Sequence, residues 1–357
     1  MCRCNCRGER PRSPIKRGTV PGDRGRSPLR KTAQYDVVGI DTPCIDLNLN
    51  LTNYPAKGLG EGIRQLNWQG GGKVATGIVA CARLGAKCAM MGSAGDDIFG
   101  RFIISDFIRH GIDTSAMQIK TGETSPLSVV LSEAAHGTRT ILYSDSSGAH
   151  YSHANINEDM LRSTKYFFIS QANSVTNRAA DIARESGAKI FIDADSYCTK
   201  IVDMLPKIDI FVGSEFFYRE MFADGLHESN CRKVMDMGPQ IVLFTFGENG
   251  CAGVSGQGFF TLPAFPVNVV DTVGAGDVFH GAFLAGLLQN CTVKEAARFA
   301  SAVAAIKCTR IGGRAGIPNL QTAERFLQDG FIDYTEIDQR VKYYERGLEY
   351  AKNQTSF

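Results

Sequence analysis

The stretch Val267–Gln289, VNVVDTVGAGDVFHGAFLAGLLQ, decides the fold of this chain. Its first residues alternate apolar and polar side chains, as at the end of a strand. Gly274-Ala275-Gly276 then breaks the pattern, and an apolar-rich helix is predicted over Val278–Leu288. A strand, a glycine turn and a helix start aim free backbone N–H groups at one point, where the helix dipole adds partial positive charge. The stretch therefore predicts a site for an anion such as phosphate.

Asp277 places a carboxylate in the first turn of this predicted helix, beside the proposed anion. The residues alone leave two interpretations open. The carboxylate compensates the helix dipole, which is worth ~0.3–1 kcal/mol. Alternatively, it is a general base that takes a proton from a hydroxyl attacking a phosphoryl group.

Composition narrows the class of protein. The chain has 357 residues, of which 43% are hydrophobic, enough for one large α/β domain or two smaller ones. No apolar run approaches the length of a membrane-spanning helix. Eleven scattered cysteines favour reduced thiols in a cytoplasmic protein over a disulfide framework. Beyond residue 33, 29 basic side chains face 35 acidic ones, so no nucleic-acid surface is predicted.

Residues 1–34 form a basic segment with almost no large apolar side chain, and residues 1–33 hold ten Lys and Arg against two acidic residues. Such a composition cannot bury a core, so the segment is predicted to be disordered. Cys2, Cys4 and Cys6 are too closely spaced for a zinc site and lack a second ligand pair. A transit peptide and a start codon assigned too far upstream both stay open.

A second glycine-rich motif, Gln69-Gly-Gly-Gly-Lys-Val-Ala-Thr-Gly77, lies upstream of the first. Together with Asp271-Thr-Val-Gly-Ala-Gly-Asp-Val-Phe279 it resembles the ribokinase-like (PfkB) carbohydrate kinase family, whose signatures are G-G-x-x-x-N and D-T-x-G-A-G-D-x-F. The resemblance extends over Asp36–Pro318, most of the chain. It implies an α/β fold with a central, mostly parallel sheet, helices on both faces and a small β lid.

The strand pattern agrees with that implication. From Lys165 onward, short apolar runs alternate with amphipathic stretches, which is typical of a parallel sheet covered by helices on both faces. Two β-rich segments, about residues 47–68 and 119–144, are assigned to the lid, and their exposed apolar faces predict a homodimer. We therefore expect a kinase domain over residues 35–330 and a helical tail over residues 331–357.

The resemblance also implies how a sugar is held. Asp46, after the first predicted strand, matches a family aspartate that binds substrate hydroxyls, although Asp41 and Asp46 also suit turns. Glycines let a backbone approach a polyol closely. The same role is therefore implied for a set in the second motif: Gly71, Gly72, Lys73 and Thr76. Thr76 stands where the family usually has Asn, which leaves the identity of the sugar open.

On the nucleotide side, the loop Thr245-Phe-Gly-Glu-Asn-Gly250 resembles the family's nucleotide loop, and Ser301 falls where relatives place a small polar residue against the adenine. The residues implied in ATP binding are Thr245, Gly247, Gly250 and Ser301. The backbone amides implied in stabilising charge on the transferred group are those of Gly274, Ala275, Gly276 and Asp277.

Two cation sites follow less directly from the resemblance. The family's N-x-x-E motif, which organises magnesium-bound water, is altered here to Ser214 and Phe217 at its usual places, and Glu215 is the remaining acid. In many relatives the loop Cys308–Pro318 holds a monovalent cation such as K⁺ together with Asp271.

These implications predict transfer of the ATP γ-phosphoryl group to a sugar hydroxyl, with Asp277 as the base and ATP and Mg²⁺ as cofactors. The segment Ala275–Ala285, with His280, and the run Lys307–Pro318 most resemble sugar kinases of the ketose type, which favours a ketose such as fructose, or a derivative. An adenosine-type nucleoside kinase and a catalytically degenerate sugar or nucleotide sensor are the alternatives. A nicotinamide dehydrogenase is disfavoured because Phe279 stands where G-x-G-x-x-G needs its third glycine. No nucleic-acid or membrane partner is expected.

Overall fold

The computed structural model describes residues 33–133 and 138–352, which belong to one compact unit. The segment predicted to be disordered, residues 1–34, lies almost wholly outside the described residues. No helix in the described part of the chain is both long enough and apolar enough to cross a membrane.

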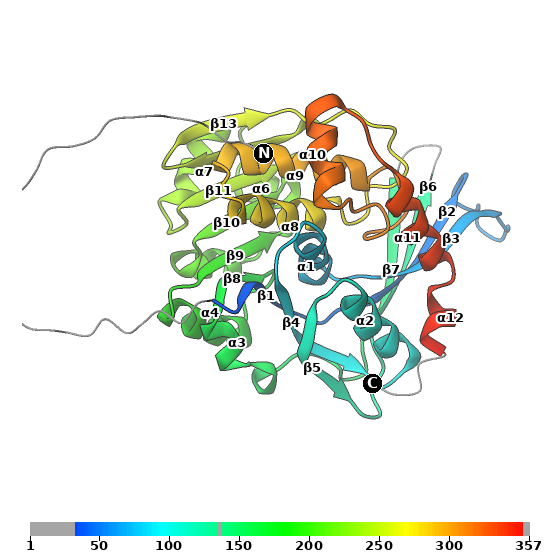
Figure 1. The fold of residues 1–357 in the computed structure, drawn as a ribbon. Helices are drawn as coiled ribbons and strands as arrows, with labels where there is room; N and C mark the ends of the chain where they lie inside the picture. The colour runs from blue at the N-terminus through cyan, green and yellow to red at the C-terminus, as the bar shows by residue number, and fades with distance from the viewer. Residues whose placement is uncertain (1–32, 134–137, 353–357) are drawn as a thin grey trace, which may run out of the picture. The chain divides into compact units, whose positions relative to one another are not determined.

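A nine-stranded sheet forms the centre of the fold, in the order β13-β12-β11-β10-β9-β8-β1-β4-β5 (Figure 1). The strands from β5 to β11 in this order are parallel, and β12 and β13 are antiparallel. The predicted, mostly parallel sheet is therefore confirmed. The strand bounds are β1 Tyr35–Asp41, β4 Cys88–Gly95, β5 Asp113–Lys120, β8 Thr164–Ile169, β9 Lys189–Ala194, β10 Ile210–Ser214, β11 Ile241–Thr245, β12 Cys251–Ser255 and β13 Gly258–Leu262.

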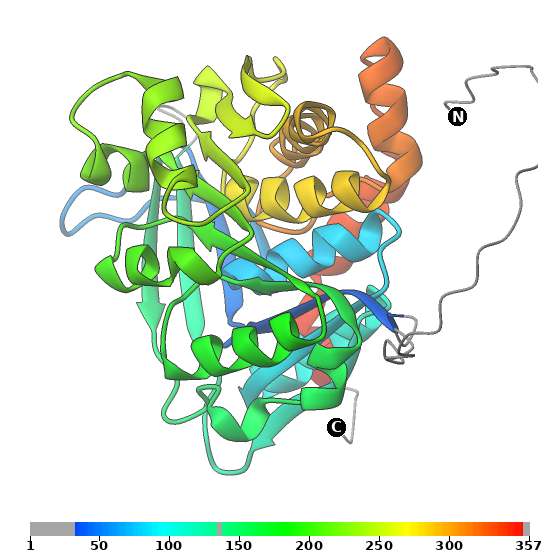
Figure 2. The same cartoon turned by 90° about the vertical axis from the view of Figure 1, so that its left-hand side faces the viewer.

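Helices cover both faces of this sheet (Figures 1 and 2). Alternate strand residues face two separate cores, so that Phe168 packs with α1 and α8 whereas Phe167 packs with α4. On the first face lie α1 Lys73–Arg83, α2 Ile98–Arg109, α8 Ala275–Leu288, α9 Val293–Lys307 and α10 Leu320–Asp329; on the second lie α3 Glu158–Arg162, α4 Ser174–Glu185, α5 Thr199–Met204, α6 Glu215–Met221 and α7 His227–Met235.

The strand order reverses at β1, which pairs with β4 on one side and with β8 on the other. In open α/β sheets, ligands bind beyond the carboxyl ends of the strands at such a point. β1 ends at Asp41, and β9 ends one residue before Asp195. The topology therefore places acidic side chains at the edge where a site is expected.

A second sheet has four strands in the order β3-β2-β6-β7. Their bounds are β2 Ile45–Leu51, β3 Ile63–Gly70, β6 Leu127–Glu133 and β7 Thr138–Ser144. Along β2 the polar side chains of Asp46, Asn48 and Asn50 are buried, whereas the alternating Leu47 and Leu49 are partly exposed. This sheet thus turns its polar face inward, the reverse of the usual arrangement.

The bounds of the small sheet differ from the expected lid segments. Ile119 and Lys120 end β5 of the large sheet, so the second lid segment begins at Leu127 and not at residue 119. Alternation of apolar residues predicts a strand but not which sheet it joins. The stretch 134–137 within the segment lies outside the described residues.

Helices α1 and α8 cross at two glycines, Gly77 and Gly281. A Cβ on Gly281 would lie 2.1 Å from the carbonyl oxygen of Gly77, which is too close for any side chain. The thiol of Cys81 donates to the carbonyl of Gly281 over 3.1 Å. These contacts bring α1, the helix after the upstream glycine motif, into close packing with α8, the helix after Gly274.

The predicted helical tail contains α11 (Thr335–Glu345) and α12 (Gly347–Lys352), which pack against β3 and α2 (Figure 1). Tyr344 is fully buried, and its hydroxyl donates to Asp106 Oδ1 over 2.8 Å. His110 Nε2 lies 3.1 Å from the same hydroxyl, and burial lowers the pKa of His110 to about 3. The histidine is therefore neutral at physiological pH.

Arg314 connects the buried Asp106 and Tyr344 to the glycine motif before α1. Its guanidinium is fully buried and reaches Asp106 Oδ2 at 2.6 Å. It also donates to the carbonyl of Gly71 over 3.0 Å, and Gln69 Oε1 accepts from the Arg314 backbone N–H over 2.7 Å. A buried charge is tolerated only when it is paired in this way.

The α1–α8 crossing predicts a sharp response to one methyl group. Gly281→Ala should lower the free energy of unfolding by about 1–3 kcal/mol, because the helices must separate to admit the new atom. Chemical denaturation measures the change. Gly256→Ala is the matched control, because its Cβ would meet nothing within 4 Å. Equal unfolding free energies for the two variants would contradict the close packing.

Candidate active site

The start of α8 has the geometry of an anion site. Gly274 adopts φ 70° and ψ 7°, a left-handed conformation that glycine accepts without strain, and it lies against Gly313. The N–H of Ala275 donates a hydrogen bond to the carbonyl of Thr272 over 3.2 Å. The next N–H groups, those of Gly276 and Asp277, point out of the helix start as such groups do, and the space beside Gly276 is open.

Asp277 lies in this first turn within a cluster of charged groups. Burial raises the pKa of Asp277 well above its usual range, the carboxylates of Asp193, Asp195 and Asp41 add to the rise, and the ammonium of Lys73 opposes it. Lys73 Nζ lies 2.7 Å from Asp195 Oδ2, with both side chains nearly half exposed. The arrangement holds a carboxyl with a raised proton affinity beside the anion site.

Asp193 and His280 are members of this cluster that sequence reasoning did not assign. Both are buried, and Asp193 Oδ2 lies 3.0 Å from His280 Nδ1 although neither side chain has a hydrogen bond of good geometry. Ligand atoms of Asp193, His280 and Asp277 all lie within 4.8 Å of one another. One feature of the sequence could have identified this site: Asp193 and Asp195 lie at the carboxyl end of a predicted strand, where ligands of open α/β sheets bind.

The second motif lies against Asp46. The carboxylate of Asp46 lies so close to Gly71 that a Cβ there would meet Asp46 Oδ1 at 2.3 Å. Burial raises the pKa of Asp46, while the Cys44 thiol hydrogen bond and the Arg314 charge act against the rise. Thr76 is buried in α1, and its hydroxyl accepts from Arg314 Nε over 3.4 Å.

Gly72 and Lys73 connect the second glycine motif to the acidic cluster around Asp277. Gly72 has φ 97° and directly precedes α1, where the carboxylate of Asp41 accepts from the N–H of Ala75 over 3.3 Å. Burial lowers the pKa of Lys73, but the charges of Asp193, Asp195 and Asp277 outweigh it and raise the value. Lys73 is thus a fully charged group that faces the acidic cluster.

The residues expected to bind ATP lie further along the same sheet edge. Thr245 ends β11, and the turn that contains Gly247 and Gly250 leads into β12. Ser301 on α9 hydrogen-bonds Cys251, the first residue of β12. A hollow of about 330 Å³ beside this turn is lined by Glu215, Tyr218, Arg219, His227, Phe246, Asn249, Cys251, Ala252 and Thr261.

The two residues expected at cation sites both interact with other groups of the protein. Glu215, the first residue of α6, forms an ion pair with Arg219 one turn later. Asp271 is buried, and its carboxylate accepts from the N–H groups of Val273 (2.9 Å) and Gly312 (2.8 Å). Neither carboxylate lies in the cluster around Asp277.

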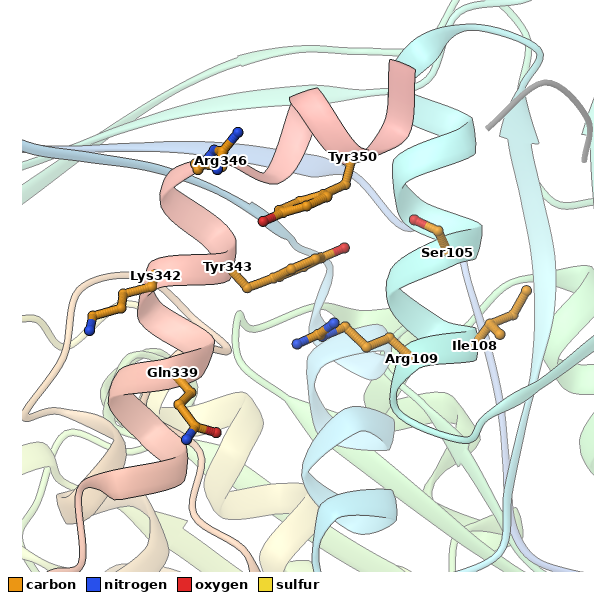
Figure 3. Close-up of a pocket in the computed structure, with 8 residues that line it drawn as sticks. All are labelled: Ser105, Ile108, Arg109, Gln339, Lys342, Tyr343, Arg346 and Tyr350. Atoms are coloured by element: carbon orange, nitrogen blue, oxygen red, sulfur yellow. The ribbon is translucent and has the colours of Figure 1, made fainter. Parts of the chain in front are cut away.

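Two further hollows border other parts of the fold. One of about 370 Å³ lies between the small sheet and the segment before α8, where Arg139 Nη1 donates to Thr272 Oγ1 over 3.1 Å. Another of about 750 Å³ lies between α2 and the last two helices, where Arg109 stacks 3.7 Å from the centre of the Tyr343 ring (Figure 3). The second contains none of the expected site residues.

Comparisons with known proteins show which family the chain resembles. A family model described as pfkB family carbohydrate kinase matches residues 34–320. A 5-dehydro-2-deoxygluconokinase of Geobacillus thermodenitrificans (strain NG80-2) is 28% identical over 325 residues, covering 84% of this chain and 95% of that protein. Fructokinase-1 of Oryza sativa subsp. japonica is 28% identical over 285 residues, covering 72% of this chain and 87% of that protein.

Among solved structures, the ribokinase of Arabidopsis thaliana complexed with ribose and ATP has a TM-score of 0.70. It covers 82% of this chain and 99% of its own at 19% identity. At this level of identity the likeness concerns the fold.

Proposed function

Because the chain belongs to the pfkB family of carbohydrate kinases, we propose that this phosphotransferase moves the ATP γ-phosphoryl group to a hydroxyl of a ketose such as fructose, or of a keto derivative of a sugar. The observation that carries the proposal is the position of Asp277, in the first turn of α8 beside open space and charged neighbours. The two curated relatives bear the names of kinases of a ketose and of a dehydro, that is keto, sugar acid.

In the proposed mechanism, Asp277 accepts the proton of the attacking hydroxyl. Its raised pKa, caused by burial and by Asp193, favours proton uptake, and the Lys73 charge limits the rise. The N–H groups of Gly276 and Asp277, with the helix dipole, stabilise the charge that develops on the transferred group. No covalent intermediate with the protein is required.

The sugar is held by the second motif. The Asp46 carboxylate beside Gly71 accepts hydrogen bonds from hydroxyls, and the left-handed Gly72 lets the chain turn toward them. Arg314 fixes the carbonyl of Gly71 from behind. The inward polar face of the small sheet, which carries Asp46, also holds the buried atoms Asn48 Oδ1 and Ser132 Oγ, which have no hydrogen-bond partner.

ATP is assigned to the edge formed by Thr245, Gly247, Gly250 and Ser301, and the Arabidopsis thaliana ribokinase with bound ATP supports ATP as the donor. Mg²⁺ takes oxygen ligands and neutralises phosphate charge when it is bound with the nucleotide. Asp195 fits that environment better than Glu215, because the charge of Asp195 acts on Asp277 and Glu215 lies outside that cluster. All eight cysteines of the described residues are free thiols, which supports a reducing, cytoplasmic location.

The small sheet is the proposed dimer interface. Its outward face carries apolar side chains in register, Leu49 beside Leu66 and Leu131, and Val129 beside Leu142. Leu142 is 56% exposed and Leu66 is 37% exposed. A contiguous apolar sheet face of this kind needs a partner, and a second copy of the chain offers the same face.

A panel of acceptors tests the substrate class. Release of ADP is measured by a coupled assay with fructose, other ketoses, keto sugar acids, aldoses and adenosine. We expect kcat/KM for the best keto compound to exceed that of its aldose counterpart by about tenfold or more, because a site built for specific polar groups rejects analogues that leave those groups unpaired. A preference for adenosine, or no sugar-dependent ADP release, would overturn the proposal.

The dimer is tested by charge on its proposed interface. Leu142→Arg should convert a dimer into a monomer, measured as molar mass by light scattering, because a buried guanidinium would lack a partner. Ile108→Arg on α2, where the native side chain is 60% exposed, should leave the dimer intact. A monomeric wild-type protein, or a dimer that survives Leu142→Arg, would show that another arrangement holds.

A further inference from the structure

A buried ammonium group lies against the segment that leads into the anion site. Lys307 is the last residue of α9, and its side chain is fully buried. Its Nζ donates to the backbone carbonyl of Asp271 over 2.9 Å. The N–H groups of Val270 and Asp271 in turn donate to the carbonyl of Cys308. The end of α9 therefore holds this segment by main-chain and side-chain bonds together.

The resemblance to carbohydrate kinases implied a K⁺ site at Asp271 and the loop after α9. K⁺ is held in proteins by several oxygen atoms at once, often backbone carbonyls. At Asp271 these oxygens already accept hydrogen bonds. The carboxylate accepts from the N–H groups of Val273 and Gly312, and the carbonyl accepts from Lys307.

Three carbonyl oxygens of the loop after α9 accept hydrogen bonds as well. The carbonyl of Ile311 accepts from Gln69 Nε2 over 2.9 Å, and that of Ala315 accepts from Arg340 Nε over 3.0 Å. The carbonyl of Thr309 accepts from Arg310 Nη1 over 2.8 Å. These donors are side chains of the protein itself, and they compete with an added K⁺ for these oxygens.

We propose that the ammonium group of Lys307 is a built-in cation that takes the place of diffusible K⁺, so that phosphoryl transfer is independent of monovalent cations. An ammonium group is a compact monovalent charge, and here it contacts the backbone oxygen of Asp271. The ammonium group is buried with this carbonyl as its hydrogen-bond acceptor, and the Asp271 side chain is buried as well. Both charges act on Cys308, whose pKa is raised by burial and by Asp271 and lowered by Lys307.

Lys307 is thus a positioning residue. It fixes the carbonyl of Asp271, three residues before the left-handed Gly274 that starts α8. Its effect on turnover is therefore exerted through the helix start, and the activity part of the test rests on the proposed kinase function.

The wild-type protein gives the first measurement. Turnover and melting temperature are recorded in KCl, NaCl and tetramethylammonium chloride at equal ionic strength. We expect both quantities to be the same in the three salts. A higher rate or melting temperature in K⁺ than in the other salts would overturn the proposal, because it would show that a diffusible ion still binds.

Variants at Lys307 give the second measurement. Lys307→Ala removes the charge and leaves room for an ion, so in Na⁺ we expect turnover to fall about tenfold or more, with a lower melting temperature. K⁺ should restore most of both. Lys307→Met fills the same space without a charge and should not respond to K⁺. Lys294→Ala, an exposed lysine of the same helix, should match the wild type in every salt.

The two readouts separate this inference from the proposed function. If no sugar is phosphorylated, the melting temperatures alone decide whether Lys307→Ala has become responsive to K⁺. If Lys307→Ala does not fold in Na⁺, its refolding yield in K⁺ is compared. Folding in K⁺ alone would support the built-in cation. Equal failure in both salts, or wild-type turnover of Lys307→Ala in Na⁺, would overturn it.

Discussion

The crossing of α1 over α8 is the contact on which the site depends. Gly77 and Gly281 let the two helices approach until backbone meets backbone, and Gly77 also lies against the Phe168 ring and near the carbonyl of Asp277. The crossing point lies about one turn after the start of α1 and nearly two turns after the start of α8. Both helix starts therefore converge, and their dipoles place partial positive charge where phosphate is expected. Lys73 and Asp277 are neighbours for this reason.

The carboxyl groups gathered at the two helix starts differ in the direction of their pKa shifts. Burial and the surrounding carboxylates raise the pKa of Asp277, and Lys73 acts in the opposite direction. Asp195, paired with Lys73, has a lowered pKa because that pairing outweighs the effect of burial. One carboxyl of the cluster is thus disposed to take a proton while its neighbour stays ionised. Such a split between adjacent acids is typical of catalytic sites.

Much of this arrangement could be predicted from local sequence. The parallel sheet followed from short apolar runs, and the anion site followed from a glycine turn at a helix start. The assignment of lid strands failed near residue 119, because alternation does not specify the partner strand. Asp193 and His280 were missed because they meet only when β9 lies under α8. Lys307 was missed because a lysine at the end of a helix is usually exposed and interacts with the helix dipole. Its burial becomes visible only in the tertiary structure.

The most direct test of the account is the variant Asp277→Asn. The amide keeps the shape and hydrogen-bonding capacity of a residue at a helix start but removes the charge and the base. We expect kcat to fall on the order of 10²–10⁴-fold, while calorimetry finds ATP binding retained and the melting temperature within a few degrees of the wild type. Near-normal turnover in a correctly folded Asp277→Asn variant would contradict the central claim that this carboxylate accepts the hydroxyl proton.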